Sequence, residues 1–376
     1  MFKINYNNCI TNVACSILKY FNCKYYHNTN SNLDEILQKK SPKNVVLVLF
    51  DGLGSRLLNK VLNKDSFLIK HRIQEISSVF PSTTASSTLS IQTGLNPCEH
   101  GWLGWTNFIS PLNAIIQLFW GTERGKRFDE KSDIFNEIKK TYLSPKTLAE
   151  IIKEKNNDTY FVSPYGDYKY QTLNSMLEII ESKINIKTDK KKFFYVYNKE
   201  PDSTLHNLGC GAKEVNDLIL ERNSKLEEFY NNKLDNDTLM IILSDHGHID
   251  GDSIHLTDYK DILELMETDT FGEDRCPMFK IKEGEKDKFK QLFEKYFGNF
   301  FILLSKDEIK DKKIFGDIGY EENPLFDSSL GDFIAINKGN NNKVIYGENG
   351  FEPFSVHGGL SDDEIYIPLI VLSKSP

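Results

Sequence analysis

The chain has 376 residues, of which 39% are hydrophobic and 27% are charged, and its formal net charge is -8 at pH 7. This length is typical of one large domain that carries an insertion. The mild negative charge offers no basic stripe, so we expect neither a nucleic-acid polymer nor a membrane surface as a partner.

The N-terminal segment lacks the basic and apolar regions of a signal peptide, and no apolar run approaches the roughly 20 residues of a membrane span. The six cysteines contain no CxxC pair. In a chain without a signal peptide, free thiols are favoured over disulfides, and a cytoplasmic location is expected. Cys9, Cys15 and Cys23 are too widely spaced for a typical zinc site, because such sites favour closer pairs.

Short runs of β-branched and aromatic residues alternate with helical patterns along the chain. Strands are predicted over residues 44–50, 159–164, 191–198, 238–245 and 364–373. A helix is expected to begin at Ser144 as N-cap with Pro145 in its first turn. A crossover helix is predicted by apolar residues at helical spacing, namely Val215, Leu218, Ile219, Leu226 and Phe229. The pattern predicts an α/β fold, a three-layer sandwich with a mostly parallel central sheet.

Residues 255–345 interrupt this alternation. They read as strand, helix, strand and helix, followed by another strand and an Asn/Gly turn. We therefore predict a small α+β cap inserted over 255–345 into a core formed by 1–254 together with 346–376. A second region, 107–140, is expected to form a lid beside the site.

Potential metal ligands follow each of the strong strands. Ligands bind open α/β sheets at the carboxyl ends of the strands. A single carboxylate after a strand is at least as often a cap of the following turn as a metal ligand. Ligand-type side chains near four strand ends of one chain indicate a metal site. The side chains are Asp51, Asp202, His206, Asp245, His246 and His357. Mixed Asp and His ligands suit Zn²⁺, Mn²⁺ or Fe²⁺ better than Ca²⁺ or Mg²⁺. Six ligands fit two ions that each keep an open position.

A paired metal site favours a phosphoryl substrate, and the segment 79–105 is rich in small hydroxyl residues. A helix is expected to begin there, near Thr83 or Thr84. Backbone N–H groups at a helix N-terminus attract anions. Taken alone, the pattern favours an ordinary Ser/Thr N-cap over an anion site.

Five blocks in order carry a resemblance: "LFDGLG", "FPSTTAS…TGLNPCEHG", "EPDSTLHNLG", "LSDHGH" and "HGGLSDDEIYIPLIV". They resemble the alkaline phosphatase superfamily, and within it the type I phosphodiesterase/nucleotide pyrophosphatase branch. The resemblance implies two metal ions, one held by Asp51, Asp245 and His246 and the other by Asp202, His206 and His357. It also implies that Thr84 is the nucleophile and contacts the metals.

Two further positions follow from the same resemblance. The family places an asparagine that binds phosphoryl oxygens after its "HG" block. Here Trp105 stands near that position and Asn107 follows two residues later, so Asn107 is assigned the oxyanion role. His248 and His255 match no usual ligand and are not assigned.

The predicted activity is dinuclear metal-dependent hydrolysis of phosphodiester or pyrophosphate bonds through a phosphothreonine intermediate. Zinc is the expected metal and manganese the alternative. The substrate is expected to be a small phosphoester, nucleotide-like if Trp105 stacks on a base. The alternatives are a phosphomonoesterase or phosphonate hydrolase of the same superfamily, and a non-catalytic metal-binding protein. No arginine adjoins any of the motifs, which favours a diester over a dianionic monoester.

Overall fold

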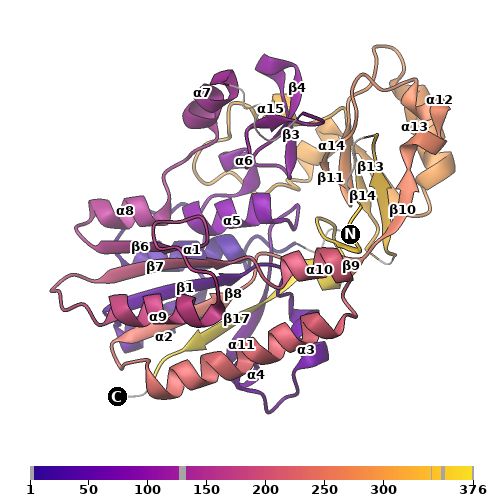
Figure 1. Ribbon diagram of the computed structural model, residues 1–376. Coiled ribbons are helices and arrows are strands. Elements are labelled where there is room, and N and C mark those ends of the chain that lie inside the picture. Colours follow the sequence, from indigo (N-terminus) through magenta and orange to yellow (C-terminus); the bar gives the residue numbers. More distant parts are fainter. Residues whose placement is uncertain (1–3, 127–132, 340, 349–351, 375–376) are drawn as a thin grey trace.

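The computed structural model describes residues 4–126, 133–339, 341–348 and 352–374 (Figure 1). Its central sheet has six strands in the order β2-β17-β8-β1-β7-β6. The strands are β1 (Asn44–Phe50), β2 (Arg72–Ser77), β6 (Asp158–Val162), β7 (Lys192–Asn198), β8 (Thr238–Leu243) and β17 (Tyr366–Leu372). β1 pairs in parallel with β7 and β8, and β6 pairs in parallel with β7, whereas β17 is antiparallel to both neighbours. The predicted mostly parallel sheet is confirmed.

Helices cover both faces of this sheet, which explains why β1 is apolar at nearly every position. Val46, Val48 and Phe50 pack into one apolar cluster, and Val45 and Leu47 into the other, because successive side chains of a strand point to opposite faces. The first cluster includes α3 (Ser55–Val61), α4 (Phe67–Lys70), α9 (Leu173–Ile184) and α11 (Lys213–Asn232). The second includes α1 (Ile10–Tyr20), α2 (Ser31–Lys40), α5 (Thr84–Thr93) and α8 (Leu148–Glu154). The result is the expected three-layer sandwich.

The helix predicted from Ser144 begins later than expected. Thr147 is the N-cap of α8: its hydroxyl accepts a hydrogen bond from the N–H of Glu150, and the Glu150 carboxylate accepts one from the N–H of Thr147. This reciprocal capping box satisfies two otherwise unpaired backbone donors. The prediction that Pro145 lies in the first turn was therefore wrong.

A second sheet of seven strands forms the cap, in the order β13-β14-β12-β11-β3-β4-β5. Its members are β3 (Thr106–Ile109), β4 (Ala114–Gln117), β5 (Thr122–Glu123), β11 (Phe271–Glu273), β12 (Cys276–Phe279), β13 (Phe301–Ser305) and β14 (Phe333–Asn337). The strands of 106–123 and those of 271–337 share this sheet, so the cap is not built from 255–345 alone. The strands within 107–140 form part of it rather than a separate lid. Residues 127–132 and 340 of these two predicted regions lie outside the described residues.

The order strand, helix, strand, helix predicted for the insertion is present as β12, α13 (Lys286–Phe297), β13 and α14 (Lys306–Asp311). Two short pairings lie where the chain passes between core and cap: β10 (Asp252–His255) with β15 (Lys343–Tyr346), and β9 (Ile249–Asp250) with β16 (Ser355–Val356). The remaining helices are α6 (Pro97–His100), α7 (Asp133–Tyr142), α10 (Asp202–Leu208), α12 (Lys260–Leu263), α15 (Phe326–Ser329) and α16 (Asp362–Ile365). Short 3-10 turns cover Ser110–Leu112 and Leu256–Asp258.

All six cysteines are free thiols, as predicted, and all but Cys210 are buried. Among the described residues, no helix combines the length and apolar character needed to cross a bilayer.

Candidate active site

The strand order brings motifs that are distant in sequence to one edge of the central sheet. β1 lies between β7 and β8, with Phe50 beside Asn198 and Leu49 beside Leu243. The residues that follow these three strand ends therefore meet, because parallel strands end on the same side. Asp51, Asp202 and Asp245 enter the site in this way.

Thr84 is the first residue of α5 and lies against the first predicted ligand set. Its Oγ1 is 3.1 Å from His246 Nε2 and 3.4 Å from Asp51 Oδ1. His246 Nε2 is also 3.3 Å from Asp51 Oδ1 and 3.7 Å from Asp245 Oδ2. The structure thus brings Thr84, Asp51, Asp245 and His246 together.

Hydrogen bonds hold these side chains in place from behind. Asp245 Oδ1 accepts from the N–H groups of Gly52 and His246, each at 3.1 Å. His246 Nδ1 lies 3.1 Å from the carbonyl of Gly247, so Nδ1 carries the proton and Nε2 presents its lone pair to the site. The Tyr197 hydroxyl donates to Asp51 Oδ2 at 2.5 Å.

The second predicted ligand set lies beside the first. The ligand atoms that lie within 4.8 Å of one another there are those of Asp202, His246, His248 and His357, a group that contains His248 and not the predicted His206. Asp202 and His206 are one helical turn apart on α10, with Asp202 Oδ1 and His206 Nε2 at 3.2 Å. His206 Nδ1 donates to the carbonyl of Ser355 at 2.7 Å, which directs Nε2 toward Asp202. The β9–β16 pairing brings His357 in, with Nε2 at 3.8 Å from Asp202 Oδ1. The rings of His246 and His357 stack at 3.8 Å between centroids, so the two sets adjoin.

The chemistry of these side chains fits two divalent cations. Asp245 Oδ2 is buried and has no hydrogen-bond partner among the described residues. Burial, together with the charge of a neighbouring carboxylate, raises the pKa values of Asp51 and Asp245 well above the usual range. Burial alone would also raise the pKa of Asp202, but hydrogen bonds from His206 and His248 hold it well below its usual range. Buried carboxylates that repel one another beside imidazole lone pairs are the donor set that a divalent cation stabilises.

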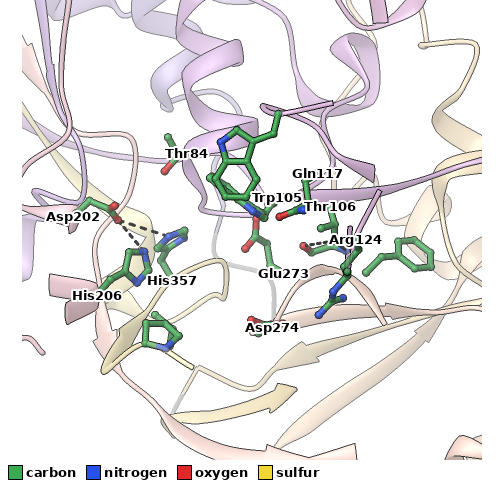
Figure 2. Close-up of a pocket in the computed structure, with 16 residues that line it drawn as sticks. Thr84, Trp105, Thr106, Gln117, Arg124, Asp202, His206, Glu273, Asp274 and His357 are labelled. Carbon is green, nitrogen blue, oxygen red and sulfur yellow. Dashed lines mark hydrogen bonds and ion pairs between the residues drawn. The ribbon is translucent and has the colours of Figure 1, made fainter. Parts of the chain in front are cut away.

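A cavity of about 550 Å³ opens in front of these residues. Figure 2 shows Asp202, His206 and His357 on one wall, Thr84 above them, and Arg124 and Asp274 on the opposite side. The wall formed by the cap also contributes Trp105, Trp120, Phe271 and Glu273. Burial raises the pKa of Glu273 to about 7 and that of Asp274 to about 7. The cavity is therefore bounded by ligand side chains on the core and by aromatic and ionisable side chains on the cap.

The sequence profile of the type I phosphodiesterase/nucleotide pyrophosphatase family matches residues 45–349. The chain belongs to this family. As a type I phosphodiesterase/nucleotide pyrophosphatase it is a hydrolase of phosphoric esters. The match ends before His357, which the structure nevertheless places beside Asp202.

Solved structures of similar fold come from the same group of enzymes. Murine ectonucleotide pyrophosphatase/phosphodiesterase 5 is 20% identical, with 88% of each chain covered and a TM-score of 0.63. The human protein of that name is 17% identical, with 88% of each chain covered and a TM-score of 0.65. An inactive threonine-to-alanine variant of the murine protein, in complex with AMP, is 18% identical over 86% of this chain and 87% of that one, with a TM-score of 0.61. A search of curated proteins gave no match.

In this phosphodiesterase, Asn107 does not face the cavity. Its Nδ2 donates to the carbonyl of Gly101 at 2.8 Å, and its Oδ1 accepts from the N–H of Leu103 at 3.3 Å. The side chain is 1% exposed. Both ends of the amide are used within the local turn, so the structure does not support the predicted oxyanion role of Asn107.

Trp105 does line the cavity, where its indole lies edge-on to that of Trp120 at 5.3 Å between centroids. Its backbone N–H donates to Glu273 Oε1 at 2.6 Å. Two other aromatic residues of this stretch, Trp102 and Phe108, are buried in the apolar core. Of the aromatic residues in this segment, Trp105 and Trp120 are available to a substrate.

His248 is the site residue that the sequence analysis did not assign. Its Nε2 lies 2.8 Å from Asp202 Oδ1, nearer than either predicted histidine of that set. The available signal was its position in "SDHGHID", two residues after His246 at the end of a buried strand. His255, the other unassigned histidine, is partly exposed and pairs with Glu352 at 3.4 Å.

Proposed function

We propose that this phosphodiesterase is a dinuclear metal-dependent enzyme that hydrolyses phosphodiester or pyrophosphate bonds of nucleotide-like small molecules through a phosphothreonine at Thr84. One observation carries the proposal. Thr84 Oγ1 faces the cavity at 3.1 Å from His246 Nε2 and 3.4 Å from Asp51 Oδ1, at the N-terminus of a ten-residue helix. A nucleophile, a ligand set and an anion-binding helix end therefore coincide.

Zinc, with manganese as the alternative, would be held by Asp51, Asp245 and His246 at one position and by Asp202, His206 and His357 at the other. When bound, such a pair supplies positive charge that favours deprotonated oxygen nucleophiles near neutral pH and stabilises the negative charge of the phosphoryl group. The lone pairs of His206 and His246 already point into the site, since the backbone carbonyls of Ser355 and Gly247 take their Nδ1 protons.

The residues of the chain then account for both chemical steps. Thr84 Oγ1, having lost its proton, forms a bond to phosphorus while the bond from phosphorus to the leaving oxygen breaks. The N–H groups in the first turn of α5 stabilise the phosphoryl oxygens. Water next bonds to phosphorus, the Thr84 Oγ1–phosphorus bond breaks, and the hydroxyl is restored. Two in-line displacements give net retention of configuration at phosphorus.

The cavity offers aromatic surface on which a flat group of the substrate, such as a nucleobase, can stack. Trp105 and Trp120 present aromatic surface within it, and base–aromatic stacking contributes about 1–3 kcal/mol per base. The structural relative seen with AMP is an inactive threonine-to-alanine variant, which is consistent with a nucleotide bound beside a catalytic threonine in that protein.

Among the described residues that line the cavity, Arg124 is the cation that bears on the choice between diester and monoester. Its guanidinium donates to the carbonyl of Thr270, and its charge lowers the pKa of Asp274 against the effect of burial. The carboxyl groups of Glu273 and Asp274 line the same wall of the cavity as Arg124 and, when ionised, offset its positive charge, which disfavours the second negative charge of a monoester. We therefore propose a diester or pyrophosphate as substrate.

The test is to strip the purified protein of metal, restore Zn²⁺ or Mn²⁺, and compare an aryl phosphodiester, a nucleoside 5′-aryl phosphodiester and the matching aryl monoester. We expect kcat/KM to be highest for the nucleoside diester and to vanish in chelator. Faster turnover of the monoester would identify a phosphomonoesterase instead. Binding of metal without turnover of any ester would identify a non-catalytic protein.

A further inference from the structure

We infer that His248 is a positioning residue of the proposed metal site: it donates a hydrogen bond from Nε2 to Asp202 and holds that carboxylate in the orientation that binds a cation. The inference rests on the proposed function, since it concerns the second ligand set. It adds a residue that occupies no ligand position implied by the family resemblance.

The contacts of His248 define which nitrogen carries its proton. Nε2 is 2.8 Å from Asp202 Oδ1, and Nδ1 is 3.0 Å from the hydroxyl of Ser355. With the proton on Nε2, the imidazole donates to the carboxylate, and Nδ1 accepts from the serine hydroxyl. The carbonyl of the same Ser355 accepts from His206 Nδ1 at 2.7 Å. Ser355 therefore supports two histidines that meet the same aspartate.

The contact between His248 and Asp202 has the length of a hydrogen bond. Two atoms bonded to one zinc ion at about 2.0–2.1 Å lie about 3.3 Å apart in tetrahedral geometry. His206 Nε2, at 3.2 Å from Asp202 Oδ1, is near that value, whereas His357 Nε2 is 3.8 Å away. The ligand atoms of Asp202, His246, His248 and His357 lie within 4.8 Å of one another, so metal-binding measurements must distinguish a hydrogen-bond donor from a ligand. His248 Nε2, at 2.8 Å, is at the distance of a hydrogen bond to a carboxylate. The imidazole of His248 thus acts on Asp202 directly.

His248 is more deeply buried than the two histidines of the second ligand set. Its side chain is 0% exposed, whereas those of His206 and His357 are 26% and 9% exposed, and these two line the cavity. Gly52 makes room for it: at φ of +73° a Cβ there would lie 3.0 Å from both Nε2 and Cδ2 of the imidazole. His248 is packed between Gly52 and the aspartate.

Hydrogen bonds to ligating side chains fix their orientation, and removing such a partner typically weakens metal binding 10–100-fold. The experiment measures the dissociation constants of both Zn²⁺ ions by chelator competition in wild type, His248→Leu and His248→Gln. We expect His248→Leu to weaken one ion about 10–100-fold and leave the other unchanged. His248→Gln should recover most of the affinity, because its amide N–H₂ can donate from a position close to Nε2. The exposed His255→Leu is the matched control and should change neither constant.

Other outcomes would overturn the inference. Unchanged affinity in His248→Leu would mean that the hydrogen bond has no influence on the metal. Loss of an ion even at saturating Zn²⁺ would make His248 a direct ligand. Equal weakening of both ions, with a lower melting temperature of the metal-free protein, would make its role one of general packing.

A second variant covers the case in which His248→Leu does not fold. Ser355→Ala removes the hydroxyl beside His248 Nδ1 and keeps the carbonyl that orients His206, so the same ion should bind more weakly. Unchanged affinity there would also refute the inference. If the wild-type protein binds no metal at all, the proposed function itself fails. If two ions bind equally well with and without His248, only the inference about His248 fails.

Discussion

Replacing Thr84 with alanine tests the identity of the nucleophile, and replacing Thr83 provides the neighbouring control. The two threonines are adjacent, but only Thr84 Oγ1 lies within 3.1 Å of His246 Nε2 and 3.4 Å of Asp51 Oδ1. Thr83 is fully buried as the N-cap of α5, beside the carboxyl of Glu273. The proposed attacking oxygen is therefore that of Thr84 rather than that of Thr83.

The expected magnitudes differ by several orders. Loss of an enzyme nucleophile lowers kcat on the order of 10⁵–10⁶-fold, which is about 7–8 kcal/mol of activation free energy. Thr84→Ala removes that oxygen but leaves Asp51, Asp245 and His246 in place, so both metal ions should remain. Thr83→Ala removes a small buried side chain and should lower the unfolding free energy by about 1 kcal/mol, with turnover reduced less than about tenfold.

The assay combines steady-state hydrolysis of an aryl phosphodiester with metal analysis of each variant. Acid quenching of a single turnover, followed by peptide mapping, should find on Thr84 of the wild type the phosphoryl group together with the ester group that did not leave. Activity in Thr84→Ala within tenfold of wild type would mean that water attacks phosphorus directly. An inactive Thr83→Ala beside an active Thr84→Ala would assign the nucleophile to Thr83.

Three further changes probe the second metal, the cavity wall and the link between cap and core. Asp202→Ala should leave one ion per chain and abolish most activity, because it removes the carboxylate shared by the second ligand set; an unchanged metal-to-protein ratio would contradict the assignment. Trp105→Ala should weaken nucleotide-like diesters roughly 10- to 100-fold in kcat/KM, from the stacking energy of about 1–3 kcal/mol, and a small alkyl diester less. A uniform loss with a lower melting temperature would show that the indole is structural. Arg275→Met should lower the unfolding free energy of the metal-free protein by about 3–5 kcal/mol, measured in urea. The reason is that Arg275 forms a fully buried ion pair with Glu364, at 3.0 Å and 2.7 Å, and its loss leaves that carboxylate uncompensated. A loss below 1 kcal/mol would show that water or neighbouring groups replace the guanidinium.

Each ligand pair in the site could be predicted from a short stretch of sequence. Asp245 and His246 follow a strand that is apolar on both faces, and such a strand is recognised from its own residues. Asp202 and His206 are four residues apart, and on a helix that spacing places both on one face. In the structure both pairs lie at the edge of the central sheet where the motifs predicted them. The positions of these pairs could be predicted because burial and helical periodicity are properties of a local segment, whereas their role as metal ligands stays a prediction.

The arrangement of these pairs around one another depends on contacts that no local pattern reports. Sheet order places β1 between β7 and β8, and the cap sheet joins Thr106 to Gly272 across more than 160 residues of sequence. The direction of a polar side chain depends on which partners the fold brings within reach. Asn107 satisfies both ends of its amide in its own turn, away from the cavity. His248 finds Asp202 because the strand ends converge. The hydrophobic pattern of the sequence indicates which residues are buried. The hydrogen-bond partners of the buried polar side chains depend on how distant segments pack against one another, which only the tertiary structure decides.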